Sequence, residues 1–226
     1  MKRLAVLVIL LAGVPAFAGD SKTTGATTPV PAAKTPAPAA KADAKTSGPG
    51  TTAVKAANEK ISALLKQKPA AGSKEEKDLA GKVTTSVRDF LDIDELGKRA
   101  MADQWGKLTA AQQTEFLTTL RSLIEDNYVK GLRANLSYTV DYTGESTDKD
   151  GNTVVTTTIN TKRKNRTVKI SVDYILKKQG DKLKAYDVKT DGVGLVDNYR
   201  TQFNKIVEKE GFNGLIARMK KKQSAT

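Results

Sequence analysis

The sequence predicts an α+β domain in which helices precede and follow a four-stranded antiparallel sheet. Apolar residues recur every three to four positions between residues 54 and 130, which is typical of amphipathic helices. They then alternate with polar residues between 136 and 190, which is typical of strands with one buried face. Helical spacing returns after residue 193. Elements grouped in this way, rather than alternating, favour an α+β architecture.

The helices before the sheet are predicted from their apolar faces and from their first residues. The first spans about 54–67 and ends before Pro69. Three later helices begin at a capping box, in which a small polar residue is followed three positions later by Glu or Gln. These pairs are Ser73 with Glu76, Asp92 with Glu95, and Thr109 with Gln112. The last of the three opens the longest helix, whose apolar face runs from Phe116 to Leu132 and which ends near Gly131.

Four strands follow, and the turns between them are short. The strands are predicted at 136–142, 154–161, 168–176 and 183–190. The turn at 148–152 contains half of a calcium-loop pattern, but Thr157 stands where that loop needs a glutamate, so a plain turn is predicted. Short turns between successive strands imply an antiparallel meander. Paired glycines at 192 and 194 then lead into a final amphipathic helix, whose apolar stripe is expected to begin at Val193.

The N-terminal part of the chain is predicted to stay outside the folded domain. Residues 1–18 have a positive start, an apolar run and a small-residue cleavage box, which is the pattern of an export signal peptide. Residues 19–57 are rich in Ala, Pro, Thr and Lys, and are expected to form a disordered linker. The folded domain is therefore predicted at 58–226, and the mature protein is expected to be exported across the inner membrane.

The composition excludes several kinds of covalent link, catalytic group and metal site. The chain has no cysteine and no histidine, so disulfides, thiol nucleophiles and the commonest general base and zinc ligand are missing. The formal net charge is +13. A basic exported protein suits an anionic membrane surface or an acidic protein, and nucleic acid is not an expected partner. Scattered lysines that only maintain solubility explain the same charge equally well.

Several short segments occur in an order that resembles a known family. These are Ala185–Val188, Asp191–Val193, Asn198–Phe203 and Glu210–Ile216, preceded by Trp105–Gln113 and the helix over 116–128. Their succession resembles the periplasmic phospholipid-shuttle proteins of the Mla pathway, also called the toluene-tolerance family. The resemblance covers nearly all of the predicted domain. It departs at Gly194, where the family commonly has serine.

The resemblance implies a sheet-and-helix fold that encloses a deep apolar cavity for phospholipid. It also implies an inner-membrane ABC transporter complex and an outer-membrane lipoprotein complex as partners, with ATP hydrolysed elsewhere. The chain itself is then expected to be a periplasmic, monomeric carrier in transient contact with membranes, without a cofactor or metal and without catalytic residues. The apolar faces supply the candidate lipid-binding residues. These are Leu120, Ile124, Tyr128, Val140, Tyr142, Val172, Tyr174, Val188, Val193, Leu195, Tyr199 and Phe203.

Two other functions fit the same sequence. Related cone-shaped folds include isomerases with a pocket aspartate, and Asp187 beside Tyr186 and Val188 is the carboxylate that could play this role. Alternatively, the predicted lining is ordinary core and the domain is an adaptor without a ligand. Basic clusters at 162–166 and 218–222 could dock onto an anionic surface, or could be a charged hairpin tip and a frayed solubilising tail.

Overall fold

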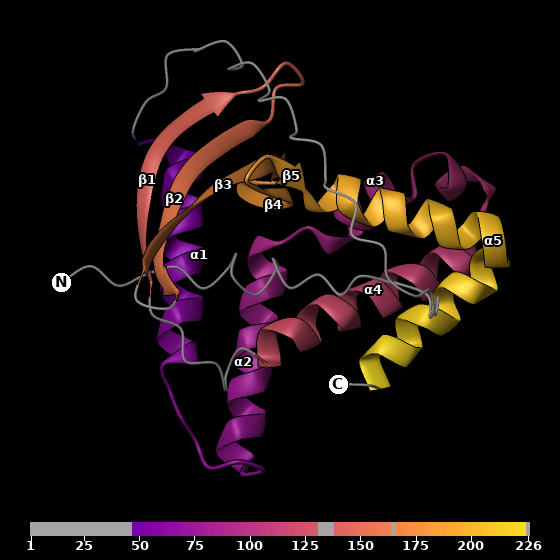
Figure 1. Cartoon of the computed structure of the whole chain (residues 1–226), viewed down its shortest axis with the longest axis horizontal. Coiled ribbons are helices and arrows are strands. Elements are labelled where there is room, and N and C mark those ends of the chain that lie inside the picture. Colours follow the sequence, from indigo (N-terminus) through magenta and orange to yellow (C-terminus); the bar gives the residue numbers. More distant parts are fainter. Residues whose placement is uncertain (1–46, 131–137, 164–165, 225–226) are drawn as a thin grey trace.

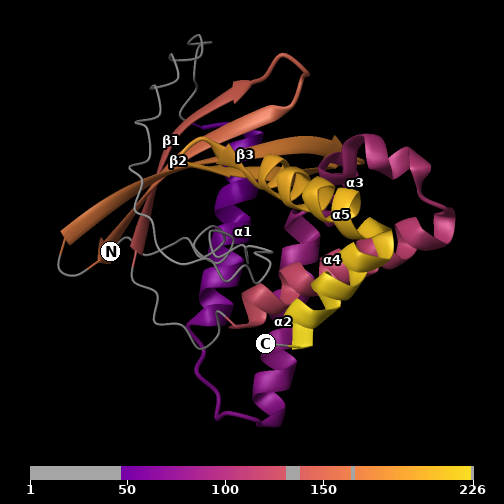
Figure 2. The ribbon, with the colours of Figure 1, turned by 45° about the vertical axis from the view of Figure 1, so that its right-hand side comes forward.

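The computed structural model describes residues 47–130, 138–163 and 166–224. Figures 1 and 2 show one curved sheet with the helices gathered on one side of it. The elements that come before the sheet are α1 (Pro49–Leu65), α2 (Lys74–Phe90), α3 (Ile93–Met101), a 3₁₀ turn η1 (Ala102–Lys107) and α4 (Ala110–Lys130). The sheet contains β1 (Tyr138–Thr147), β2 (Thr153–Arg163), β3 (Arg166–Gln179), β4 (Lys182–Thr190) and β5 (Val193–Gly194), and α5 (Leu195–Ser224) follows. The predicted α+β class and antiparallel meander are confirmed.

All three predicted N-caps are formed, and at Thr109 the reciprocal bond of a full capping box, from the Thr109 N–H to Gln112 Oε1 (2.9 Å), is present as well. The backbone N–H of Glu76 donates to Ser73 Oγ over 3.1 Å, and that of Glu95 donates to Asp92 Oδ1 over 3.0 Å. At the start of α4, the Gln112 N–H donates to Thr109 Oγ1 over 3.3 Å. Each bond satisfies a backbone donor that the first turn of a helix leaves without an intrahelical partner.

The first helix begins earlier than predicted. It starts at Pro49, so residues 49–57, expected in the linker, belong to the domain. The Glu145 carboxylate on β1 accepts hydrogen bonds from the N–H groups of Gly50 (3.1 Å) and Thr51 (2.7 Å). Burial alone would raise the pKa of Glu145, but the hydrogen bonds from Thr51 and Gly50 outweigh it and lower the pKa. This cap comes from residues far away in the sequence, which is why local pattern did not reveal it.

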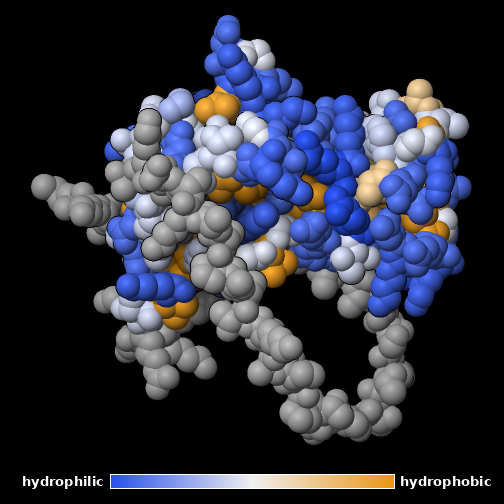
Figure 3. Space-filling model, turned by 90° about the horizontal axis from the view of Figure 1, so that it is seen from above, coloured by the Kyte–Doolittle hydropathy of each residue, from blue (hydrophilic) through white to orange (hydrophobic). Residues whose placement is uncertain are grey.

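The sheet has a polar outer face and an apolar inner face. Paired residues of neighbouring strands continue the inner face from β1 to β3, as in the row Val140–Ile159–Ile170 and the row Tyr142–Thr157–Val172. The outer face carries rows such as Asp141–Thr158–Ser171. This confirms that Asp141 and Asp173 lie on the polar side. Figure 3 shows a surface in which hydrophilic residues predominate and hydrophobic ones appear in patches between them.

A fifth strand replaces the first turn predicted for the last helix. Asp191 and Gly192 have φ values of 47° and 84°, and this tight turn brings Val193 and Gly194 back to pair with Thr190 and Lys189. Val193 is therefore on a strand, and 62% of its surface is exposed. The prediction that Val193 belongs to the apolar stripe was wrong.

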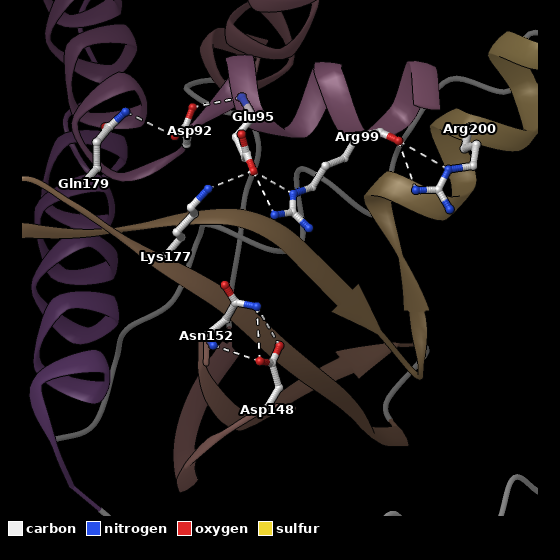
Figure 4. A network of polar contacts seen from close by, with 8 residues as sticks. All are labelled: Asp92, Glu95, Arg99, Asp148, Asn152, Lys177, Gln179 and Arg200. Atoms are coloured by element: carbon white, nitrogen blue, oxygen red, sulfur yellow. Dashed lines mark hydrogen bonds and ion pairs between the residues drawn. The ribbon is translucent and has the colours of Figure 1, made fainter. Parts of the chain in front are cut away.

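Polar contacts fix α3 against the sheet and against α5, as Figure 4 shows. The Glu95 carboxylate accepts from Arg99 over 2.8 Å and from Lys177 over 3.3 Å. The Arg200 guanidinium on α5 donates to the Arg99 carbonyl over 3.0 and 3.3 Å. Since that carbonyl lies in the last turn of α3, the cation also complements the helix dipole.

The C-terminal basic cluster is part of the folded domain. α5 is interrupted at Gly211, which has φ 69°, and then continues to Ser224. Met219 is fully buried, Arg218 pairs with Glu210, and Lys220 Nζ lies 2.7 Å from Glu115 Oε1 on α4. The alternative of a frayed tail was therefore wrong. In the other basic cluster, 162–166, residues 164 and 165 lie outside the described residues, and the register pairs Arg163 at the end of β2 with Arg166 at the start of β3.

Candidate functional site

The inner face of the sheet and the helices beneath it bring five of the six tyrosines of the chain together. Tyr128 on α4, Tyr174 on β3 and Tyr199 on α5 are at most 1% exposed. Burial raises the pKa of Tyr128 well above its ordinary value, and the neighbouring phenols of Tyr174 and Tyr199 raise it further. Tyr138 and Tyr142 on β1 are half-buried and complete the group. We call these five residues the tyrosine interior: Tyr128, Tyr138, Tyr142, Tyr174 and Tyr199.

A buried asparagine from α1 enters the tyrosine interior. Asn58 is fully buried, and its Nδ2 donates to the Tyr142 hydroxyl over 3.1 Å. Its Oδ1 and the hydroxyl of Tyr174 are both buried, and neither makes a hydrogen bond within the described part of the chain. Burial raises the pKa of Tyr174, and the nearby Asn58 amide opposes this rise only in part. Buried polar atoms without partners are uncommon in folded proteins and need an explanation.

Asn58 was not among the predicted site residues, although the sequence contained a signal for it. It stands four residues after Val54 and three before Ile61, so it occupies the apolar stripe of its helix. All three residues are 0% exposed. A polar residue in that register must either find a partner inside the protein or be present for a ligand. Tyr138 was also missing from the predicted set, although it alternates in register with Val140 and Tyr142.

The predicted lining residues fall into two groups according to their packing. Phe203 and Tyr199 stack with ring centroids 5.1 Å apart, and Phe203 meets Phe116 edge to face at 5.5 Å. These rings fill the contact between α4 and α5, where Leu120, Ile124 and Leu195 are also buried. Val172 and Val188 lie buried beneath the sheet. By contrast, Val140 and Tyr142 are only partly buried, on the edge strand β1. Val193 belongs to neither group, because it is exposed.

Asp187 is held in a structural position. Its Oδ1 accepts from the N–H groups of Val188 (2.8 Å) and Val196 (3.1 Å), so it caps the first turn of α5 from the neighbouring strand. Burial raises the pKa of Asp187, and these two hydrogen bonds oppose the rise. A Cβ atom at Gly194 would lie only 2.7 Å from Asp187 Oδ2. A serine at this position would therefore require the Asp187 carboxylate to move.

The other carboxylates predicted beside the strands have partners of their own or lie apart from one another in the described residues. Asp148 accepts from the backbone N–H groups of Asp150 and Asn152 and from the Asn152 side chain, so the turn that resembles half a calcium loop satisfies its own carboxylate. Among the residues that the structure describes, no three His, Cys, Asp or Glu side chains lie close enough together to hold a metal ion. None of the helices in the same residues is long and apolar enough to cross a membrane.

The fold is that of a small α+β domain, and comparison with known proteins gives the family. The family model "MlaC protein" matches residues 55–221, and the chain belongs to this family. The resemblance inferred from the sequence is thereby confirmed. Among curated proteins, no match was found.

A solved structure has the same fold. It is the phospholipid-binding protein from Ralstonia solanacearum in complex with a phospholipid. The TM-score is 0.64 at 23% sequence identity, and the match covers 77% of this chain and 96% of that one. At this level of identity, the likeness concerns the fold.

Proposed function

We propose that the protein is a periplasmic phospholipid carrier that holds acyl chains in and around the tyrosine interior. The observation that carries this proposal is the pair of buried polar atoms without partners, Asn58 Oδ1 and Tyr174 Oη, within an otherwise apolar interior. Membership of the MlaC family and the phospholipid in the Ralstonia structure support the same ligand class. The proposal assigns no cofactor other than the lipid cargo and no catalytic step.

The binding energy in this proposal comes mainly from the acyl chains. Each buried methylene contributes about 0.8 kcal/mol, so one long chain contributes on the order of ten kcal/mol before ordering costs. The polar atoms contribute orientation. The Tyr174 hydroxyl can donate to an ester carbonyl, whereas Asn58 Oδ1 can accept from a lipid hydroxyl or a water molecule. The half-buried residues of β1, namely Tyr138, Val140 and Tyr142, are where we propose that the chains enter.

We further propose that the carrier is exported by the segment 1–18 and acts as a monomer. It would exchange lipid between an inner-membrane ABC transporter complex and an outer-membrane lipoprotein complex. The support for this step is the family assignment and the export pattern of the N-terminus. Linker residues 19–46 and segment 1–18 lie outside the described residues.

Filling the proposed entry tests the function. Val140→Trp adds a large side chain to the inner face of β1 at a half-buried position, so we expect a folded protein that has lost most of its bound lipid. Ser171→Trp is the matched control, because Ser171 is exposed on the outer face of the same sheet. Lipid is measured by organic extraction and mass spectrometry per mole of folded protein. Equal lipid content in both variants, or no lipid in the unsubstituted protein, would contradict the proposal.

A further inference from the structure

An apolar groove is lined by residues other than those of the tyrosine interior. It is formed by one side of α1, the C-terminal end of α2, and the ends of β2, β3 and β4, and has a volume of about 910 Å³. That volume is within the range of about 300–1,000 Å³ that is usual for ligand pockets. None of the twelve lining residues predicted from the sequence is part of this groove. Figures 1 and 2 show α1 and α2 side by side beneath the sheet.

The floor of the groove is apolar and has room for an extended chain. Ala53, Ala56 and Ala57 lie on one side of α1 and present only methyl groups. Phe90, Leu176 and Leu183 complete the floor. The Phe90 ring also meets the Tyr174 ring edge to face, with centroids 6.1 Å apart. Phe90 therefore contacts both the groove and the tyrosine interior, and none of the five residues of the tyrosine interior lines the groove.

The rim of the groove carries five charged residues, three of them cationic. Lys60 Nζ lies 3.0 Å from Asp89 Oδ2, so this pair is balanced. Asp181 is exposed in the turn between β3 and β4. Lys178 and Lys182 flank that turn, are exposed, and make no ion pair with any residue that the structure describes. The hairpin end of the groove thus has a net positive charge beside an apolar floor.

We propose that this groove is a second ligand site, which binds a single-chain anionic amphiphile of the long-chain fatty acid type. The alkyl chain would lie on the alanine side of α1 and against Phe90 and Leu176. The carboxylate would lie at the β3–β4 hairpin, within reach of Lys178 and Lys182. One apolar floor with one cationic end matches one chain with one anionic head, whereas a two-chain phospholipid would leave a second chain in water.

The first test adds oleate to the purified full chain and follows binding by native mass spectrometry. We expect one oleate to bind in addition to any phospholipid that the protein carries. Ala56→Trp fills the floor at an exposed helical position and should weaken oleate binding at least tenfold. Ala63→Trp is the matched control, because it makes the same change two turns further along α1, also at an exposed position, and lies outside the groove lining. It should bind oleate like the unsubstituted protein.

The second test distinguishes the contribution of the ligand's carboxylate to binding from that of its alkyl chain. The double variant Lys178→Glu and Lys182→Glu should weaken oleate binding several-fold and leave binding of the uncharged oleyl alcohol unchanged. Lys205→Glu with Lys209→Glu makes the same charge change at exposed positions of α5 and should have no effect. This pair keeps the proposal testable if Ala56→Trp does not fold.

Three outcomes would overturn the groove proposal. They are no oleate adduct, equal binding by Ala56→Trp and Ala63→Trp, and one-for-one displacement of phospholipid by oleate. A groove-dependent oleate adduct on protein that never carries phospholipid would instead support the groove and contradict the proposed carrier function. The two proposals can therefore fail separately.

Discussion

The helical end of the domain and the space beneath β1 contain similar residues in opposite states of packing. At the helical end, Trp105, Phe116 and Phe203 form a series of edge-to-face ring contacts between η1, α4 and α5. Beneath the sheet, Tyr138 and Tyr142 stay half-buried, and the Tyr174 hydroxyl lacks a partner within the described chain. Aromatic content alone therefore does not indicate a binding site. Half-buried rings beside a buried hydroxyl that lacks a hydrogen-bond partner do indicate one.

The largest expected effect is at the packed end. Phe203 is fully buried between Phe116 and Tyr199, so Phe203→Ala should leave a cavity and lower the free energy of unfolding by about 3–5 kcal/mol. Urea denaturation measures the change. The lipid content per folded molecule should stay the same. A loss of lipid without a loss of stability would mean that Phe203 belongs to the site and not to the core.

A smaller effect is expected at the cap that joins α1 to β1. Glu145→Ala removes the acceptor of two N–H groups at the start of α1, and should cost about 1–2 kcal/mol. Because the folded-state pKa of Glu145 is lowered, its contribution is present above the ordinary value of 4.5 and is lost as pH falls through the folded value. Denaturation curves near neutral and acidic pH should therefore differ more for the unsubstituted protein than for Glu145→Ala. Parallel pH profiles would rule out this cap.

Tyr174→Phe tests whether the Tyr174 hydroxyl beneath the sheet binds lipid. In lipid-free protein it removes a buried hydroxyl without a partner, so the free energy of unfolding should be unchanged or should rise by up to about 1 kcal/mol. Phospholipid affinity should fall about fivefold, which corresponds to one lost hydrogen bond of about 1 kcal/mol. Tyr186→Phe is the matched control, since the Tyr186 ring lies under the Arg99 guanidinium and Tyr186 is not one of the five residues of the tyrosine interior. An identical affinity for both variants would remove the Tyr174 hydroxyl from the site.

The smallest effect is expected at Asp187. Its folded-state pKa is raised, so the folded protein holds this proton more tightly than the unfolded chain. The free energy of unfolding should therefore decrease as pH rises from the ordinary value of 3.8 through the raised value. Asp187→Asn keeps a capping oxygen and should remove this pH dependence, with a change below about 1 kcal/mol at neutral pH. Lipid content should not change. An unaltered pH profile would show that another group titrates.

The elements that could be predicted from sequence are those determined by local pattern. The N-caps at Ser73, Asp92 and Thr109 and the four long strands each depend on residues within a few positions of one another. The start of α1 could not be predicted, because its cap is Glu145 on a strand that follows much later. β5 depends on pairing of Val193 and Gly194 with β4, which no local alternation reveals.

The candidate site was predictable only in part, for a related reason. Alternation and helical spacing identify which side chains face inward. Tyr174 and Tyr128 were predicted to face inward in this way, and both are buried. They do not identify which inward side chains meet another side chain, and Phe203 was assigned to the lining although it packs against Phe116. Asn58 is not predicted by apolar spacing, because it is a polar residue within an apolar stripe. Whether a buried surface is completed by protein or by ligand is decided by contacts between distant elements.

The most direct test of the carrier assignment is native mass spectrometry of the purified protein, followed by organic extraction and identification of the released lipid. We expect a stoichiometric adduct that resolves into phospholipid, and its loss in Val140→Trp but not in Ser171→Trp. A clean protein mass in repeated preparations, with no uptake from phospholipid vesicles, would contradict it and favour an adaptor domain whose interior needs no ligand.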